Sequence, residues 1–261
     1  MNDPRPPFWL WPNLLSLDAP IVAVVWQDFL ARCYPSTLLA QGRWVLGLTV
    51  WAIYLADRIV DVGHPPEPAE SSRHRFYRRH KLAMRMLLGM VLLADVLVSL
   101  IWLRPAVFEN GMLLGVVVLG YLAVFAALRV GGSGWKRSTA AVVFTVGVFL
   151  VAWTGSADAW RELAIPAVAF AVLCFANLRL IETWHGRRSN WRGWIWMCCF
   201  AAACGVYGWI TGSSWFFAVG LSAAALGLLD FRAMRFSSDA WRVLADAVLL
   251  TPVLFYVQWL R

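Results

Sequence analysis

Residues 82–103 read LAMRMLLGMVLLADVLVSLIWL, and the only charged residues among them are Arg85 and Asp95. A helix needs about 20 mostly apolar residues to cross the hydrocarbon core of a bilayer. A helix that is apolar all round lies in the core of a large protein or in a membrane. This stretch is therefore predicted to span a membrane.

The rest of the chain has the same character. Of its 261 residues 61% are hydrophobic and 15% charged, whereas soluble domains average roughly 45–50% apolar and about 25% charged residues. We expect an all-α, polytopic membrane protein, with one domain over residues 1–261 and about nine transmembrane helices in one bundle. Apolar runs between Pro and Gly breakers predict these helices at 14–33, 38–60, 82–103, 107–128, 138–154, 163–183, 193–211, 214–230 and 240–259.

The basic residues predict the topology. Most of the 23 Lys and Arg fall near the N-terminus and in the loops after the second, fourth, sixth and eighth predicted helices. Cytoplasmic loops carry this excess, so the N-terminus and these loops are expected in the cytoplasm and the C-terminus outside a cytoplasmic membrane. The net charge of +8 then reflects topology and contact with membrane lipids, and nucleic acid is excluded as a partner. The opposite side holds Arg32, Arg43, Arg104, Arg161 and Arg261.

Two carboxylates close the second predicted helix. Asp57 and Asp61 are four residues apart, a spacing that places both on one helix face. Carboxylates this close repel each other. A bound cation such as Mg²⁺, which prefers oxygen ligands, would neutralise this repulsion. The alternative is that both are solvated acids at a helix end, with Arg58 pairing one of them.

A basic segment, RHRFYRRHK at residues 73–81, follows these acids. Arginine forks bind phosphate in a bidentate manner, so Arg75 or Arg78 could hold a metal-bound diphosphate. The segment could instead anchor the protein to lipid headgroups. It could also close over the site to exclude water.

Residues 57–61, DRIVD, resemble the DRxxD part of the first aspartate motif, NDxxDxxxD, of the UbiA-type intramembrane prenyltransferases. The segment SLDAPI at 16–21 is similar to the Asp-x-Pro segment of that family, and KRST at 136–139 resembles its KRxT segment. The end of the sixth predicted helix is where its second aspartate motif belongs. The nine predicted helices also equal the number in that family.

The chain departs from the family pattern at both aspartate motifs. Ile53 and Tyr54 stand where the first motif has Asn and Asp. The second motif, DxxDxxxD, aligns with Glu182, His185 and Ser189, so it keeps one carboxylate.

The resemblance implies a bundle with a central cavity facing the cytoplasm and Mg²⁺-dependent transfer of an isoprenyl group. The donor would be a prenyl diphosphate, and the acceptor a lipophilic molecule within the membrane, with an aromatic one favoured. Asp57, Asp61 and Glu182 would hold the metal, and Tyr54 would shield the allylic cation. The expected diphosphate-binding residues are Arg58, Arg75, Arg78, Lys136, Arg137, Asn177 and His185.

Asp246, expected inside the membrane near the proposed cavity, is a further candidate catalytic residue. It could act on the acceptor, or it could hold helices together, as could Asp28 and Asp95. Three functions stay open beside prenyl transfer: cyclisation of the donor by a membrane terpene cyclase of the same fold, non-catalytic lipid binding, and transport.

Overall fold

In the computed structural model, every regular element of the described residues is a helix, which confirms the all-α prediction. The structure describes residues 7–34, 40–63, 72–128, 134–155, 158–184, 193–231 and 238–256. The helices are η1 (Phe8–Leu10), α1 (Trp11–Leu14), α2 (Asp18–Cys33), α3 (Ala40–Asp61), α4 (Ser72–Arg79), α5 (Lys81–Trp102), α6 (Pro105–Leu128), α7 (Gly134–Trp153), α8 (Ala159–Trp184), α9 (Gly193–Thr211), α10 (Ser214–Phe231), α11 (Ser238–Ala247), η2 (Val248–Leu250) and α12 (Pro252–Phe255).

The six helices α5 to α10 are long and apolar enough to cross a membrane, as judged from the described residues. A seventh span results if the bent pair formed by Phe8–Leu14 and Asp18–Cys33 is counted as one. Helix α3 has 22 residues, as α5 does, but it carries charged residues near both ends. The multi-pass membrane character is confirmed, whereas the count of nine spans stays a prediction.

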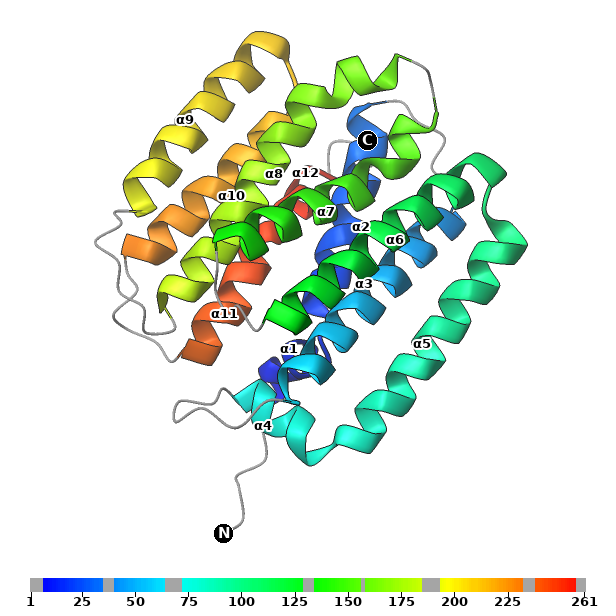
Figure 1. Ribbon diagram of the computed structural model, residues 1–261. Helices are drawn as coiled ribbons and strands as arrows, with labels where there is room; N and C mark the ends of the chain where they lie inside the picture. The colour runs from blue at the N-terminus through cyan, green and yellow to red at the C-terminus, as the bar shows by residue number, and fades with distance from the viewer. Residues whose placement is uncertain are drawn as a thin grey trace.

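The long helices lie side by side in one bundle (Figure 1). Helix α9 packs on α10, α10 on α8, and α8 on α7, while α2 lies centrally against α3, α7 and α10. On the other side, α5 packs on α3 and α6 packs on α7. Half of the apolar window of α8 and of α10 is buried, but only 11% of that of α5 and of α6. The apolar faces of α5 and α6 are therefore available to lipid.

Glycines allow α9 and α10 to approach closely. A Cβ at Gly220 would lie 3.1 Å from the carbonyl oxygen of Ala201, and one at Gly227 would lie 3.0 Å from Cβ of Met197. The turn between the helices contains Gly212 at φ 66°, a left-handed conformation that glycine adopts without strain. Small residues at a helix contact are typical of membrane proteins, because they let the backbones pack tightly.

Five large aromatic side chains form the centre of the bundle, which we call the aromatic core: Trp26, Phe29, Phe149, Phe170 and Trp215. The ring centroid of Trp26 lies 4.8 Å from that of Phe170 and 5.0 Å from that of Trp215. The Trp26 Nε1 donates a hydrogen bond of 2.7 Å to the Leu249 carbonyl. The Trp215 Nε1 likewise donates to the Pro166 carbonyl at 3.3 Å, so the aromatic core joins α2, α7, α8 and α10 with both of its indole N–H groups satisfied.

The first and ninth predicted helices are interrupted, which corrects the ranges 14–33 and 240–259. Ser16 has φ 55°, and the chain bends by 80° between residues Phe8–Leu14 and helix α2. In the ninth, α11 ends at Ala247, and η2 leads to α12, which begins at Pro252. Proline has no N–H to continue a helical ladder, and Pro252 stands at the start of α12, where no such N–H is needed.

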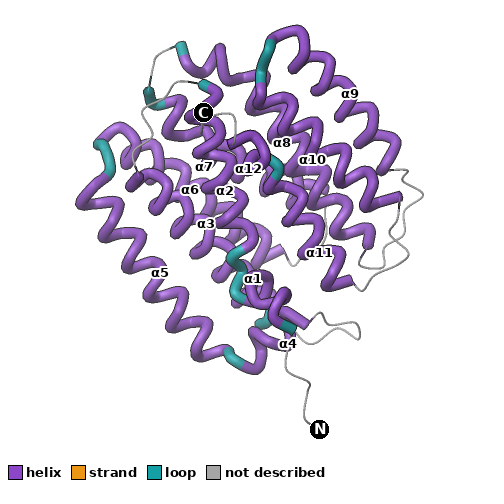
Figure 2. Tube along the Cα trace, turned by 180° about the vertical axis from the view of Figure 1, so that it is seen from behind, coloured by secondary structure: helices purple, strands orange, loops and turns teal. Residues whose placement is uncertain are grey.

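The segment between the second and third predicted helices was expected to be a loop, but it contains the helix α4. Helix α4 lies at one end of the bundle, next to α1 (Figure 2). Its Tyr77 is buried and hydrogen-bonds the hydroxyl of Ser16 at 2.9 Å. Because Arg73 precedes Tyr77 by four residues, both side chains lie on the face of α4 that meets the bundle.

Candidate functional site

Helix α4 lies at one end of the bundle (Figure 1), and charged side chains from five helices form ion pairs or are charged neighbours of one another there. This group, here called the charged end, comprises Asp57, Arg58, Asp61, Arg73, Lys136, Arg137, Glu182, Arg242 and Asp246. The five helices are α3, α4, α7, α8 and α11. Ionisable residues among membrane helices are costly to bury and mark functional sites.

Arg58 lies between the two carboxylates of α3. Its Nη1 is 3.1 Å from Oδ2 of Asp57 and 2.8 Å from Oδ2 of Asp61. Lys136 adds a contact of 3.5 Å with Asp57, and the His74 Nε2 lies 3.8 Å from Asp61. Burial would raise the pKa of Asp61, but the hydrogen bond with His74 and the charges of Arg58 and Lys136 outweigh it and hold that pKa well below its ordinary value.

Glu182 forms a second ion-paired group at the end of α8. It pairs with Arg137 of α7, and the Arg179 Nη1 lies 3.4 Å from the Oε2 of Glu182. Lys136 and Arg137 are neighbours in the first turn of α7, so this turn connects the carboxylates of α3 with the carboxylate of α8. The structure thereby brings together predicted residues that lie up to 125 positions apart in the sequence.

Arg73 is the most unusual residue of the charged end. It is 6% exposed, its Nε has no hydrogen-bond partner, and no carboxylate of the described chain forms an ion pair with it. Burial and the positive charges of Arg58 and Arg242 lower the pKa of Arg73 to about 9, although the carboxylates of Asp18 and Asp246 act in the opposite direction, so the guanidinium stays charged at neutral pH. A buried cation that faces other cations is stabilised when an anion joins it.

A polar layer lies deeper in the bundle. The Asn177 Nδ2 donates a hydrogen bond of 3.3 Å to Asp246 Oδ1, while the buried Asn177 Oδ1 has no partner among the described residues. Asp18, at the start of α2, accepts a hydrogen bond of 2.6 Å from Asn13 and is a charged neighbour of Asp246. Tyr54 packs against the main buried hydrophobic cluster of the bundle, with both of these carboxylates nearby.

The acids of the charged end do not form a ready metal site. Their oxygen atoms are of the type that Mg²⁺ prefers, but Nη1 of Arg58 lies between Asp57 and Asp61, and Glu182 is paired with arginines. No group of three or more His, Cys, Asp or Glu that could hold a metal ion occurs among the described residues. The present arrangement suits an anion better than a cation, and the role of Mg²⁺ stays a prediction.

The basic segment contributes a different arginine from those we expected. Arg75 and Arg78 are exposed in α4, and Arg75 hydrogen-bonds the nearby Ser72. Arg73 and Arg242 of α11 were not among the expected site residues. The available signal for Arg73 was its spacing of four residues from Tyr77. His185 and Ser189 lie outside the described residues.

Asp28 has a structural environment. Its carboxylate lies 2.8 Å from Nε of Arg32 and 2.6 Å from Nη2 of Arg43. These contacts join α2 to α3 at the end of the bundle remote from α4. They support the interpretation that Asp28 holds helices together.

Comparisons with protein families, curated proteins and solved structures found no match for this chain.

Proposed function

We propose that the protein is a membrane-embedded prenyltransferase that binds a prenyl diphosphate at the charged end and transfers the isoprenyl group to a lipophilic acceptor. The observation that carries this proposal is Arg73, a buried guanidinium that faces Arg58 and Arg242 and has no ion pair of its own among the described residues. Asp18 and Asp246 offset part of its positive charge from a distance, and a diphosphate would supply a direct ion pair. Its isoprenyl chain would extend among the apolar helices.

The arrangement of the resembling segments supports a divergent UbiA-type enzyme. DRIVD closes α3, the KRST segment lies in the first two turns of α7, Glu182 lies near the end of α8, and Asp18 opens α2. Ion pairs join α3 to α7 and α7 to α8 at one end of the bundle. A single site at that end requires that the motif residues of these three helices lie close together, as these contacts place them.

The proposed topology has nine spans. Helices α2, α3 and the segment from α11 to α12 would cross the membrane together with the six apolar helices. The charged end would face the cytoplasm, with the substrate cavity opening to that side, because basic loops are retained there. The C-terminus would lie outside the cytoplasmic membrane.

The chemistry follows from the charges. Arg58, Arg73 and Lys136 would neutralise the diphosphate as the bond between its oxygen and the allylic carbon breaks and the oxygen keeps the electron pair. Tyr54 would shield the resulting allylic cation through its ring face. A nucleophilic carbon or oxygen of the acceptor would then bond to the cation and lose a proton to a carboxylate such as Asp246.

Non-catalytic binding of an anionic lipid is the second candidate. It is favoured by the ion pairs of Asp57, Asp61 and Glu182. Because arginines already balance the charges of these acids, no metal is needed to do so. Cyclisation would be distinguished from transfer by a product that contains the donor's carbon chain alone. Transport would be distinguished by the absence of any new product.

The test is diphosphate release by purified protein in lipid nanodiscs. Prenyl diphosphates of several chain lengths are offered with and without Mg²⁺ and with and without a pool of lipophilic acceptors, and the products are extracted and identified. We expect release that depends on Asp57 and Asp61, which are tested as Asp57→Asn and Asp61→Asn. An acceptor-independent product would indicate a cyclase, and binding without release would indicate the lipid-binding function.

Two arginines of α4 provide a matched pair of variants. Arg73→Gln removes the buried guanidinium, whereas Arg79→Gln makes the same change at an exposed position of the same helix. We expect Arg73→Gln to weaken binding of the prenyl diphosphate by about 10- to 150-fold, as for the loss of a charged hydrogen-bonding group, and Arg79→Gln to leave binding unchanged. Equal binding by both variants would contradict the proposed site.

A further inference from the structure

The start of helix α5 carries two cations on its exposed side. Lys81 and Arg85 are both exposed, and neither forms an ion pair within the described part of the chain. They are four residues apart, so their side chains are neighbours on one face of the helix. The sequence contains no Asp or Glu from residue 72 to residue 94. This end of α5 therefore presents two adjacent positive charges that the neighbouring sequence does not balance.

The next acid along α5 is directed elsewhere. Asp95 is ten residues beyond Arg85, which corresponds to about 15 Å along a helix. Its carboxylate accepts a hydrogen bond of 2.8 Å from Thr49 of α3, so it faces the bundle. Asp95 is therefore too far from Arg85 to pair with it.

A row of exposed apolar side chains begins beside the two cations. Leu82, Met86, Met90 and Leu93 are between 61% and 72% exposed. Their spacing of three and four residues places them along one side of α5. Only 11% of the apolar window of this helix is buried in the bundle, so the row is available to the acyl chain of a lipid.

Aromatic side chains at this end of the bundle mark the level of the membrane surface. Trp9 and Trp11 are exposed and belong to the segment that bends by 80° from α2. The ring centroid of Trp11 lies 6.0 Å from that of Phe76, and the ring centroid of Phe76 lies 4.8 Å from that of His80, which precedes α5. Tryptophans are enriched at the depth of the lipid headgroups. We therefore expect the first turns of α5 at that depth.

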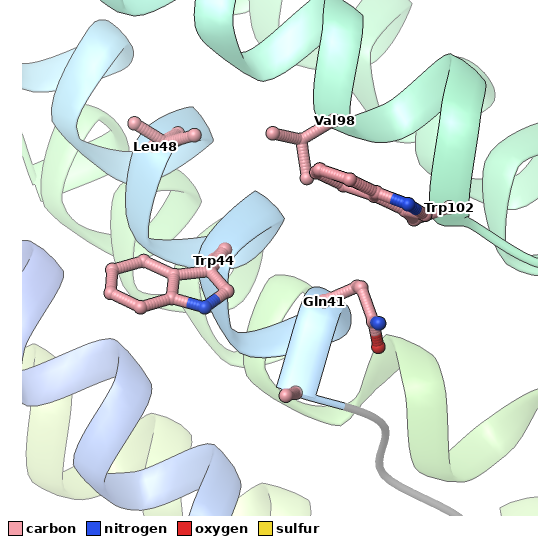
Figure 3. A pocket seen from close by; sticks show the side chains of 6 residues that line it. Gln41, Trp44, Leu48, Val98 and Trp102 are labelled. Atoms are coloured by element: carbon pink, nitrogen blue, oxygen red, sulfur yellow. The ribbon is translucent and has the colours of Figure 1, made fainter.

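The other end of α5 has a different surface. There α5 borders a groove against α3, which is lined by Ala40, Gln41, Trp44, Leu48, Val98 and Trp102 (Figure 3). None of these side chains carries a charge, so nothing in the groove selects a lipid by the charge of its headgroup. The combination of an exposed apolar row with two adjacent cations distinguishes the start of α5 from this groove.

We propose that the start of α5 binds an anionic phospholipid, whose phosphate lies between Lys81 and Arg85 and whose acyl chain follows the row from Leu82 to Leu93. Basic side chains near the membrane surface attract anionic headgroups. At helix ends their charged groups reach the headgroups while their stems lie on apolar surface. The site faces the lipid, so the proposal does not depend on whether the charged end is catalytic.

The test is a titration of the purified protein in detergent micelles with phosphatidylglycerol or with phosphatidylcholine of the same acyl chains. Bound lipid is counted by native mass spectrometry. We expect tighter binding of phosphatidylglycerol, and a preference that weakens as salt is added, because salt screens exposed charges. Glycerol phosphate, which has the phosphate without the acyl chains, should not displace the lipid at the same concentration. Equal affinity for the two lipids, or displacement by glycerol phosphate, would overturn the proposal.

Two exposed arginines provide a matched pair of variants. Arg85→Gln removes one cation of the proposed site, whereas Arg161→Gln removes a cation at the start of α8, the end of that helix opposite to Glu182. We expect Arg85→Gln to reduce the preference for phosphatidylglycerol about fivefold, the effect of one basic residue near an anionic membrane surface, and Arg161→Gln to leave it unchanged. Arg85→Lys keeps the charge and should keep the preference. Equal preferences in Arg85→Gln and Arg161→Gln would contradict the proposed site.

Discussion

The aromatic core and the charged end lie in the same bundle, but the first is made of buried rings and the second of charged side chains, most of them partly exposed. In the aromatic core, rings pack on one another, and Trp26 finds a carbonyl partner for its only polar atom. At the charged end, the buried Nε of Arg73 has no partner among the described residues, and neither has the buried Oδ1 of Asn177 in the deeper polar layer. In the aromatic core the indole N–H of Trp26 already has a partner. At the charged end a buried polar atom is still able to bind a ligand.

This difference indicates what each region contributes. Packing large aromatic side chains stabilises the fold, because a close-packed interior gains many small attractive contacts. Burying an unpaired guanidinium costs stability. We therefore expect substitutions in the aromatic core to reduce stability, and loss of the Arg73 charge to increase stability while it reduces binding.

The largest expected effect is that of Trp26→Ala in the aromatic core. Trp26 is fully buried, so its truncation leaves a cavity and removes the hydrogen bond to Leu249. We expect a loss of about 3–5 kcal/mol, measured as a lower midpoint of thermal unfolding in detergent. Trp209→Ala, at a position that is 82% exposed, is the control and should change the midpoint little. Equal effects would mean that the aromatic core does not dominate stability.

Arg73→Met should have an intermediate effect of opposite sign. Replacing a buried, unpaired charge with an apolar side chain of similar length should stabilise the ligand-free protein by about 1–3 kcal/mol, seen as a higher unfolding midpoint. Pyrophosphate at about 100 times its Kd should stabilise the wild type by roughly 2.7 kcal/mol and the variant hardly at all. A variant that is less stable than the wild type and still responds to pyrophosphate would show that Arg73 is structural.

The smallest expected effect concerns the pH dependence given by Asp61. Its pKa is lowered in the folded protein, so it stabilises the fold above its unfolded pKa of about 3.9, and this contribution is lost as the pH falls through the folded value. Asp61→Asn should be less stable than the wild type at neutral pH, and the difference should shrink under acid. The measurement is the unfolding midpoint against pH, with Asp158→Asn, at an exposed position, as the control. A difference that is independent of pH would contradict the ion pair.

Much of the fold could be predicted because hydropathy and helix breakers are local properties of the chain. The predicted ranges 193–211 and 214–230 match α9 and α10 within a residue. The prediction was wrong where backbone geometry interrupts an apolar run, as at Ser16 and Pro252. It also missed α4, whose eight residues are too polar to show the pattern of a membrane helix.

The candidate site was predicted less completely than the fold. Asp57, Asp61, Lys136, Arg137 and Glu182 were expected at one end, and the structure brings them together in ion pairs. The pairing of both acids of α3 with Arg58 was not expected. It depends on where the side chain of Arg58 lies, which the spacing of the acids does not reveal.

The sequence by itself determined that the chain is a helical membrane protein with its acids and bases concentrated at helix ends, because each of these properties is carried by neighbouring residues. Only the tertiary structure decided that Arg73, and not Arg75 or Arg78, is buried beside Arg58 and Arg242. That choice depends on how α4 is rotated against α1 and α3, and the rotation is set by the burial of Tyr77 and its contact with Ser16, 61 positions away. Contacts over such a distance arise only when the helices pack.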